Sequence, residues 1–454
     1  MNLAVSRPVA AAIIAASLLA GCQTTGISKW IPANSNVSDG TSGAADSAVP
    51  TADSAIGLTD VSFELGNDPY AYADIPPGVR PAMDTREAGL WLSIDKSEEK
   101  SKTAGNRILD KDMNAYLSEL VCTMSGPYCS DVRVYIQRIP LFNATMAPNG
   151  MMSIYSGFLL RAQNEAQLTA VLGHEIGHYI RRHSIQRLED SIAKQDFSLV
   201  FGVLAAGAGV PAAGDLMRLA MVGSIYSFSR DNEREADLIG INLMHLRGYD
   251  TREAGKIWTL LMREQDPEAD SDDVSTSTPF TSTHPSIGER IITLGAIAEK
   301  LQGPGKWGKT NEERFDKIIG PWKFQFLQDE VRLRNWKSSL ELLEILNEYG
   351  HDKAETAYFR GEIYRNRNKD ADKDAEDEEA RIADIDRALQ AYEESISLPE
   401  PPAEAYRAAG LIYLKKSDVP KAREALTEYL RLKPSAHDRK LIQYMIKNAG
   451  GMTS

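Results

Sequence analysis

Residues 164–178 have the sequence NEAQLTAVLGHEIGH, and the chain is best interpreted outward from this stretch. Asn164 followed three residues later by Gln167 is typical of a capped helix start, so we expect a helix from 164 to about 186. His174 and His178 are four residues apart and therefore lie on one helix face, one turn apart. Two imidazoles in that arrangement can bind one Zn²⁺.

Glu175 lies about 100° around the helix from His174, so it can stand beside a metal ion without binding it. That is where a general base is needed. A catalytic zinc also needs a third protein ligand, for which Glu233 is the best candidate. Asp237, one turn later on the same face, can accept a hydrogen bond from a ligating histidine, whereas Glu235 points away. Spacing alone leaves open a chance arrangement of solvated side chains.

Three ordered motifs resemble those of the HtpX-like zinc metallopeptidases, a gluzincin family with two histidines and one glutamate as metal ligands. The motifs are NEAQLTAVLGHEIGH at 164–178, SRDNEREAD at 229–237, and STHP at 282–285 followed by Arg290. The resemblance covers about residues 105–300. It implies His174, His178 and Glu233 as zinc ligands, Glu175 as the catalytic base, and Asp237 and Arg290 in supporting positions.

The same resemblance implies two further roles. His284 corresponds to a pocket residue, which either occupies the open metal position and restrains activity or stabilises the transition-state oxyanion. Strands are indicated at 132–138 and 151–156, and the second resembles the substrate-side edge strand of this family. We therefore expect an α+β metallopeptidase domain at 78–308 that is mainly helical, with a small sheet and the HExxH helix.

The N-terminus has the features of an export signal. Arg7 precedes an apolar run at 9–20 that is too short for a membrane span and ends in Leu19-Ala20-Gly21-Cys22, which resembles a bacterial lipobox. We expect a lipoprotein signal peptide at 1–21, lipidation of Cys22, and a flexible, Ser/Ala/Gly-rich tether at 22–77. Gln23 favours the outer membrane, with the protein facing the periplasm.

Cys122 and Cys129 are close in sequence with Gly126 and Pro127 between them. In an oxidising, exported compartment the pair favours a short disulfide over two free thiols, with metal ligation as a weaker third interpretation. The apolar stretch 200–222 contains Pro211 and charged residues, so we expect short packed helices there rather than a membrane span.

Residues 309–454 have helical periodicity throughout. Positions within 403–434 match the tetratricopeptide repeat (TPR) pattern, and a fainter copy lies upstream, with the acidic stretch 370–386 as an insertion; the matching residues are Tyr406, Gly410, Tyr413, Ala422 and Pro434. We therefore expect an all-α, TPR-like helical repeat domain, with an unrelated helical bundle as the alternative.

A chain of 454 residues with 43% hydrophobic and 25% charged residues is long enough for two folded domains. Its net charge of −13 argues against nucleic acid as a partner. The family resemblance, together with the export signal, implies a zinc metalloendopeptidase that degrades misfolded or unassembled envelope proteins as outer-membrane quality control. The alternative is a TPR-mediated chaperone or adaptor of outer-membrane assembly, with proteolysis secondary.

Overall fold

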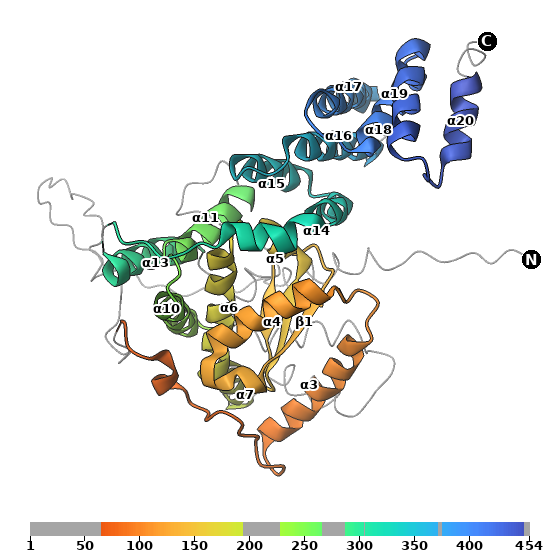
Figure 1. Cartoon of the computed structure of the whole chain (residues 1–454). Coiled ribbons are helices and arrows are strands. Elements are labelled where there is room, and N and C mark those ends of the chain that lie inside the picture. The colour runs from red at the N-terminus through yellow and green to blue at the C-terminus, as the bar shows by residue number, and fades with distance from the viewer. Residues whose placement is uncertain (1–64, 194–227, 266–286, 304, 371–374, 449–454) are drawn as a thin grey trace, which may run out of the picture. The chain divides into compact units, whose positions relative to one another are not determined.

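The computed structural model describes residues 65–193, 228–265, 287–303, 305–370 and 375–448 (Figure 1). The predicted signal peptide 1–21, Cys22, the apolar stretch 200–222 and His284 lie outside the described residues. All described residues belong to one compact unit spanning Thr51–Ser454. Within the described ranges, the helices lack the combined length and apolarity that crossing a membrane requires.

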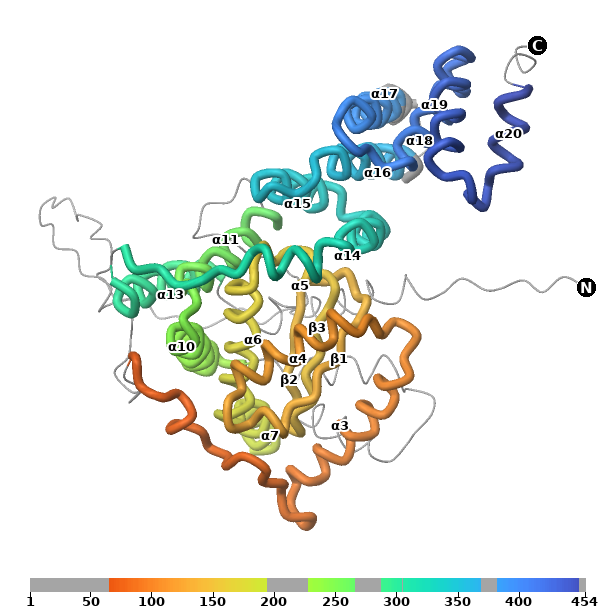
Figure 2. Tube along the Cα trace, viewed as in Figure 1, coloured from red at the N-terminus to blue at the C-terminus, as the bar shows by residue number. Residues whose placement is uncertain are grey.

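A three-stranded sheet lies beside the helix that carries the two histidines (Figure 2). Its strands are β1 (Arg133–Gln137), β2 (Ala144–Met146) and β3 (Met151–Tyr155), in the order β1-β3-β2. β3 pairs parallel to β1 and antiparallel to β2. The prediction that β3 is an edge strand is therefore wrong: β3 is central, and β2 forms the edge beside the helix that carries the two histidines. A strand of three residues is too short for an alternating pattern to reveal it.

Helices surround this sheet and account for most of the N-terminal part. Their bounds are α3 Arg86–Lys102, α4 Lys111–Ser125, α5 Ser156–Arg161, α6 Glu165–Ile180, α7 His183–Ala193, α10 Arg230–Leu246, α11 Glu253–Gln265 and α13 Ile287–Gln302, with 3₁₀ turns η1 Pro69–Tyr72 and η2 Gly126–Asp131. The helix predicted from 164 to 186 is thus two helices. It starts as expected, with the Asn164 side chain accepting from Gln167 N at 2.9 Å, but ends at Ile180 because Arg182 is left-handed, with φ 53°.

α6 and α10 cross at very small residues, which lets their backbones approach closely (Figure 2). A Cβ on Gly240 of α10 would lie 2.8 Å from the main-chain nitrogen of His174. A Cβ on Gly177 of α6 would lie 3.0 Å from the Cα of Ala236. Ordinary contacts between carbon atoms are about 3.5–4.0 Å, so side chains at these positions would force the helices apart. The glycines therefore set how near Glu233 on α10 comes to the α6 histidines.

Residues 66–78, most of which we expected to be tether, are hydrogen-bonded to the domain. Gly66 N donates to Asn242 Oδ1 at 2.7 Å, and Asp74 N donates to Ile180 O at 2.8 Å at the end of α6. Tyr128 OH donates to Ile75 O at 2.5 Å. A disulfide joins Cys122 of α4 to Cys129 of η2. Residues 66–78 therefore pack against the end of the helix that carries the two histidines.

The C-terminal residues form a succession of helices: α14 Glu312–Leu333, α15 Trp336–Glu348, α16 Lys353–Asp370, α17 Ala375–Ser397, α18 Ala403–Lys415, α19 Val419–Leu432 and α20 Arg439–Asn448. Gly361 of α16 lies against Tyr392 of α17, and Gly410 of α18 lies against Leu426 of α19. Two helical hairpins thus pack through a glycine facing a large side chain. Residues 375–386, which we expected in an inserted segment, belong to α17.

Candidate metal centre

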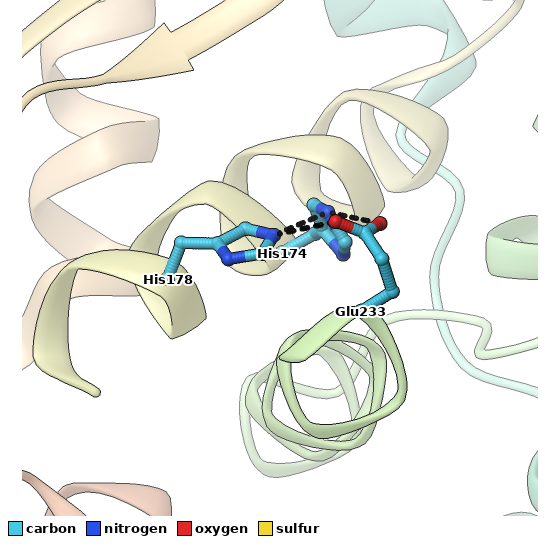
Figure 3. A group of neighbouring side chains, drawn as sticks. All are labelled: His174, His178 and Glu233. Carbon is cyan, nitrogen blue, oxygen red and sulfur yellow. Dashed lines mark hydrogen bonds and ion pairs between the residues drawn. The ribbon is translucent and has the colours of Figure 1, made fainter. Parts of the chain in front are cut away.

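His174, His178 and Glu233 converge at the crossing of α6 and α10 (Figure 3). The two Nε2 atoms are 3.0 Å apart, and the Glu233 carboxylate lies 3.5 Å from Nε2 of His174 and 3.3 Å from Nε2 of His178. One ligand atom from each residue falls within 4.8 Å of the others. Each residue is at most 2% exposed. The structure therefore brings together the three predicted ligands.

Asp237 and Arg290 contact His174 at Nδ1, the ring nitrogen that faces away from Glu233. His174 Nδ1 lies 2.8 Å from Asp237 Oδ1, which fixes the imidazole orientation and turns Nε2 toward Glu233. Arg290 Nη2 donates to the same carboxylate oxygen at 2.6 Å, and its guanidinium stacks 3.9 Å over the ring of Trp258. The structure thus places both predicted supporting residues next to His174.

The electrostatics favour neutral imidazoles, the form that binds metal ions. Burial lowers the pKa of His174 to about 4, and the nearby Arg290 charge acts in the same direction. Burial also holds the pKa of His178 well below its ordinary value. Burial acts to raise the pKa of Asp237, but the Arg290 charge and the His174 hydrogen bond outweigh it and lower that pKa. Two neutral imidazole nitrogens and a carboxylate form a donor set that suits zinc.

Glu175 lies beside this cluster and faces the edge of the sheet. Its Oε2 accepts a hydrogen bond of 3.1 Å from the main-chain nitrogen of Met146 in β2, and the residue is 1% exposed. Glu175 thus stands between the ligand cluster and the edge strand. It is placed to act on a molecule that contacts both.

Sequence reasoning missed two residues near the cluster, His183 and Phe228. His178 Nδ1 lies 2.8 Å from Nδ1 of His183, and His183 Nε2 lies 3.0 Å from Oε2 of Glu235. Glu235 does point away from the ligand cluster, as expected, but toward His183. Phe228 also stacks on the His178 ring, with centroids 3.9 Å apart. A third histidine five positions after His178 was the available signal for this contact.

The sequence around these residues matches a known family. Residues 108–298, which include the three converging ligands, Glu175, Asp237 and Arg290, match the sequence model of Peptidase family M48.

Curated relatives share the same region. The mitochondrial metalloendopeptidase OMA1 of Schizosaccharomyces pombe is 29% identical over 206 residues, which is 44% of this chain and 58% of the relative. A putative beta-barrel assembly-enhancing protease of Vibrio cholerae is 31% identical over 156 residues, 33% of this chain and 31% of the relative. The beta-barrel assembly-enhancing protease of Escherichia coli is 30% identical over 115 residues, 24% of this chain and 23% of the relative. The chain thus matches less than two thirds of each relative. Its residues 108–298 form a domain of peptidase family M48.

Proposed function

We propose that the protein is a zinc-dependent metalloendopeptidase. The observation that carries this proposal is the buried convergence of His174, His178 and Glu233 beside the carboxylate of Glu175. A structural zinc site is closed by four protein ligands, whereas three ligands with an adjacent carboxylate are the arrangement of a hydrolytic site. The family match of residues 108–298 supports the same chemistry.

His174, His178 and Glu233 would hold the zinc ion, which would supply Lewis acidity for polarising a peptide carbonyl and for lowering the pKa of a water molecule. Glu175 takes the proton of the attacking water and delivers it to the leaving amine. Asp237 and Arg290 keep His174 oriented while charge develops in the site.

The outer edge of β2 is the proposed binding site for the substrate backbone. Asn143 and Ala147, which flank β2, are hydrogen-bonded to Tyr155 and Met151 of β3. Because such bonds alternate along an antiparallel pair, Ala144 and Met146 direct their main-chain groups away from β3. The Met146 nitrogen already faces Glu175. An extended peptide added along this edge would place a carbonyl next to the base and be bound through its backbone more than its side chains.

We further propose that the protein works in the bacterial envelope, anchored through a lipid on Cys22, and removes misfolded or unassembled envelope proteins. The lipobox-like sequence at 19–22 supports the anchor. Two bacterial relatives are named as beta-barrel assembly-enhancing proteases, which supports a role in outer-membrane protein quality control. Residues 309–454 would act as a TPR-like array that receives substrates or assembly partners.

Degradation of casein, an unfolded substrate, tests the catalytic proposal. We expect wild-type protein to cleave casein, a chelator to abolish cleavage, and Glu175→Gln to be inactive while keeping its zinc. The replacement is nearly isosteric but cannot take up a proton at neutral pH. Activity of Glu175→Gln within about tenfold of wild type would mean that another group is the base.

The alternative function, a TPR-mediated chaperone or adaptor with proteolysis secondary, is separated by the same variant. A strain carrying only Glu175→Gln should fail to clear unassembled outer-membrane proteins if proteolysis is the main function. Full complementation by Glu175→Gln would instead favour the chaperone or adaptor.

The role of His284 stays a prediction from the sequence. His284→Ala is expected to raise casein cleavage, because the histidine is predicted to occupy the open metal position. A loss of about 10²–10³-fold with zinc content unchanged would instead assign it to the transition-state oxyanion.

A further inference from the structure

The two histidine ligands reach a carboxylate in different ways. His174 Nδ1 contacts Asp237 directly at 2.8 Å. His178 Nδ1 contacts His183 Nδ1 at 2.8 Å, and His183 Nε2 contacts Glu235 Oε2 at 3.0 Å. His183 is completely buried. We propose that His183 and Glu235 are positioning residues that fix the tautomer and ring orientation of His178 for metal binding.

Only one arrangement of protons along the series His178–His183–Glu235 leaves His178 able to bind a metal ion. Its Nε2 is the ring nitrogen that faces Glu233, with Oε1 at 3.3 Å, so a metal ion held between these two residues requires the lone pair on Nε2 and the proton on Nδ1. The Nδ1–H then donates to His183 Nδ1, which requires the His183 proton to be on Nε2. An ionised Glu235 carboxylate can only accept, so it selects that tautomer. The opposite tautomer of His183 would move the His178 proton to Nε2, where it blocks metal binding.

The backbone is shaped to make the His178–His183 contact. On a continuous helix the two residues would be rotated by about 140° from each other, so their rings would diverge. Instead, α6 ends at Ile180, Arg182 adopts φ 53°, and α7 begins at His183. This left-handed conformation is uncommon for residues other than glycine. Arg182 is held by an ion pair with Glu87 of α3, and the two imidazole centroids come within 4.9 Å.

Glu235 is itself anchored from the opposite side. Arg181 Nε donates to Glu235 Oε1 at 2.8 Å, so one carboxylate oxygen serves Arg181 and the other serves His183. The same guanidinium donates to Tyr72 O at 2.5 Å and to Asp74 Oδ1 at 2.7 Å. A continuous series of hydrogen bonds therefore links residues 72–74 to the proposed metal ligand His178, by way of Arg181, Glu235 and His183.

Zinc affinity, measured by competition with a chromophoric chelator on the full-length protein, tests this inference, which rests on the metal centre of the proposed function. Outer partners of metal ligands typically contribute about 10–100-fold in affinity, and we expect His183→Leu to lose that much. His183→Asn should remain within about threefold of wild type, because its amide oxygen can replace Nδ1 as the acceptor. Glu235→Gln should lose about tenfold, since an amide can donate as well as accept.

His351→Leu is the matched control. His351 forms a comparable contact with Glu355, at 3.1 Å, in the C-terminal helices, where it touches no ligand of the cluster. Circular dichroism of each metal-free variant verifies folding. If His183→Leu does not fold, the contrast between Glu235→Gln and His183→Asn decides instead.

A second readout is the proton position itself. In zinc-loaded protein labelled with ¹⁵N-histidine, the long-range ¹H–¹⁵N spectrum should show His183 protonated on Nε2. The chain has seven histidines, so comparison with His183→Asn assigns the signal. Wild-type zinc affinity in folded His183→Leu would overturn the positioning role. If His183→Leu does not fold, wild-type zinc affinity in Glu235→Gln would do so. So would an Nδ1-protonated His183. A wild type that binds no zinc would overturn the proposed metal centre together with this inference.

Discussion

The close crossing of α6 and α10 can be tested by adding one methyl group, with Gly240→Ala. The new Cβ would lie 2.8 Å from the His174 main-chain nitrogen and 3.1 Å from the Gly173 carbonyl carbon. Both neighbours are backbone atoms, so neither can rotate aside. Because ordinary contacts begin at about 3.5 Å, the helices must separate by about 0.7 Å at this point.

Gly295→Ala is the matched control, because Gly295 is also helical but has nothing within 4 Å of the added Cβ. Both substitutions gain up to about 1 kcal/mol of helix propensity. Only Gly240→Ala also incurs an overpacking cost, typically about 1–3 kcal/mol. Gly240→Ala should therefore be about 1–3 kcal/mol less stable than Gly295→Ala, with each kcal/mol lowering Tm by roughly 2–4 °C.

The metal site should respond as well. Glu233 lies two helical turns before Gly240 on α10 and moves with that helix. Ligand bonds to zinc tolerate shifts of only about 0.2 Å, so we expect Gly240→Ala to lose about tenfold or more in zinc affinity. Thermal unfolding of the metal-free variants and chelator competition measure the two effects. A Gly240→Ala protein that melts no lower than Gly295→Ala and binds zinc like wild type would refute the argument.

Three further predictions concern other parts of the chain. Burial acts to raise the pKa of Glu98, but the hydrogen bonds from Arg133 and its other partners outweigh burial and hold this pKa below the ordinary 4.5. The ionised Glu98 therefore stabilises the fold above pH 4.5, and this stabilisation is lost as pH falls through the lowered pKa. Glu98→Gln should therefore cost about 1–3 kcal/mol at pH 7, and urea titrations at decreasing pH should show the difference from wild type shrinking; a difference independent of pH would contradict this. Replacing both Cys122 and Cys129 by serine should cost about 2–3 kcal/mol in non-reducing chemical denaturation, and unchanged stability would exclude a structural contribution from the disulfide. Mass spectrometry of the mature protein should find a lipidated Cys22 at the N-terminus, and a free N-terminus at any other residue would refute the anchor.

Sequence reasoning located the ligand cluster because its signals are local. The four-residue spacing of His174 and His178 requires only a helix, and Asp237 follows Glu233 by one turn in the same way. Family resemblance then linked the two helices, which spacing alone could not do. Gly177 lies within the first motif and Gly240 lies three residues after the second, but the close approach that they allow is a tertiary contact.

The misses have equally physical causes. β2 has three residues and forms only because the chain turns back onto β3, so its place at the sheet edge was hidden. The break after Ile180 depends on Arg182 adopting a backbone conformation that no propensity favours. Without that break His183 would not face His178, and its supporting role could not be recognised from its position.

Metal content tests the central claim most directly. Elemental analysis of purified wild type, His174→Ala and Glu233→Ala, with His245→Ala as a control outside the ligand cluster, would measure zinc bound per chain. We predict about one zinc per chain in wild type and in His245→Ala, and a large loss in both ligand variants, because a catalytic zinc needs all three protein ligands. Equal zinc in wild type and His174→Ala would contradict the proposed metal centre.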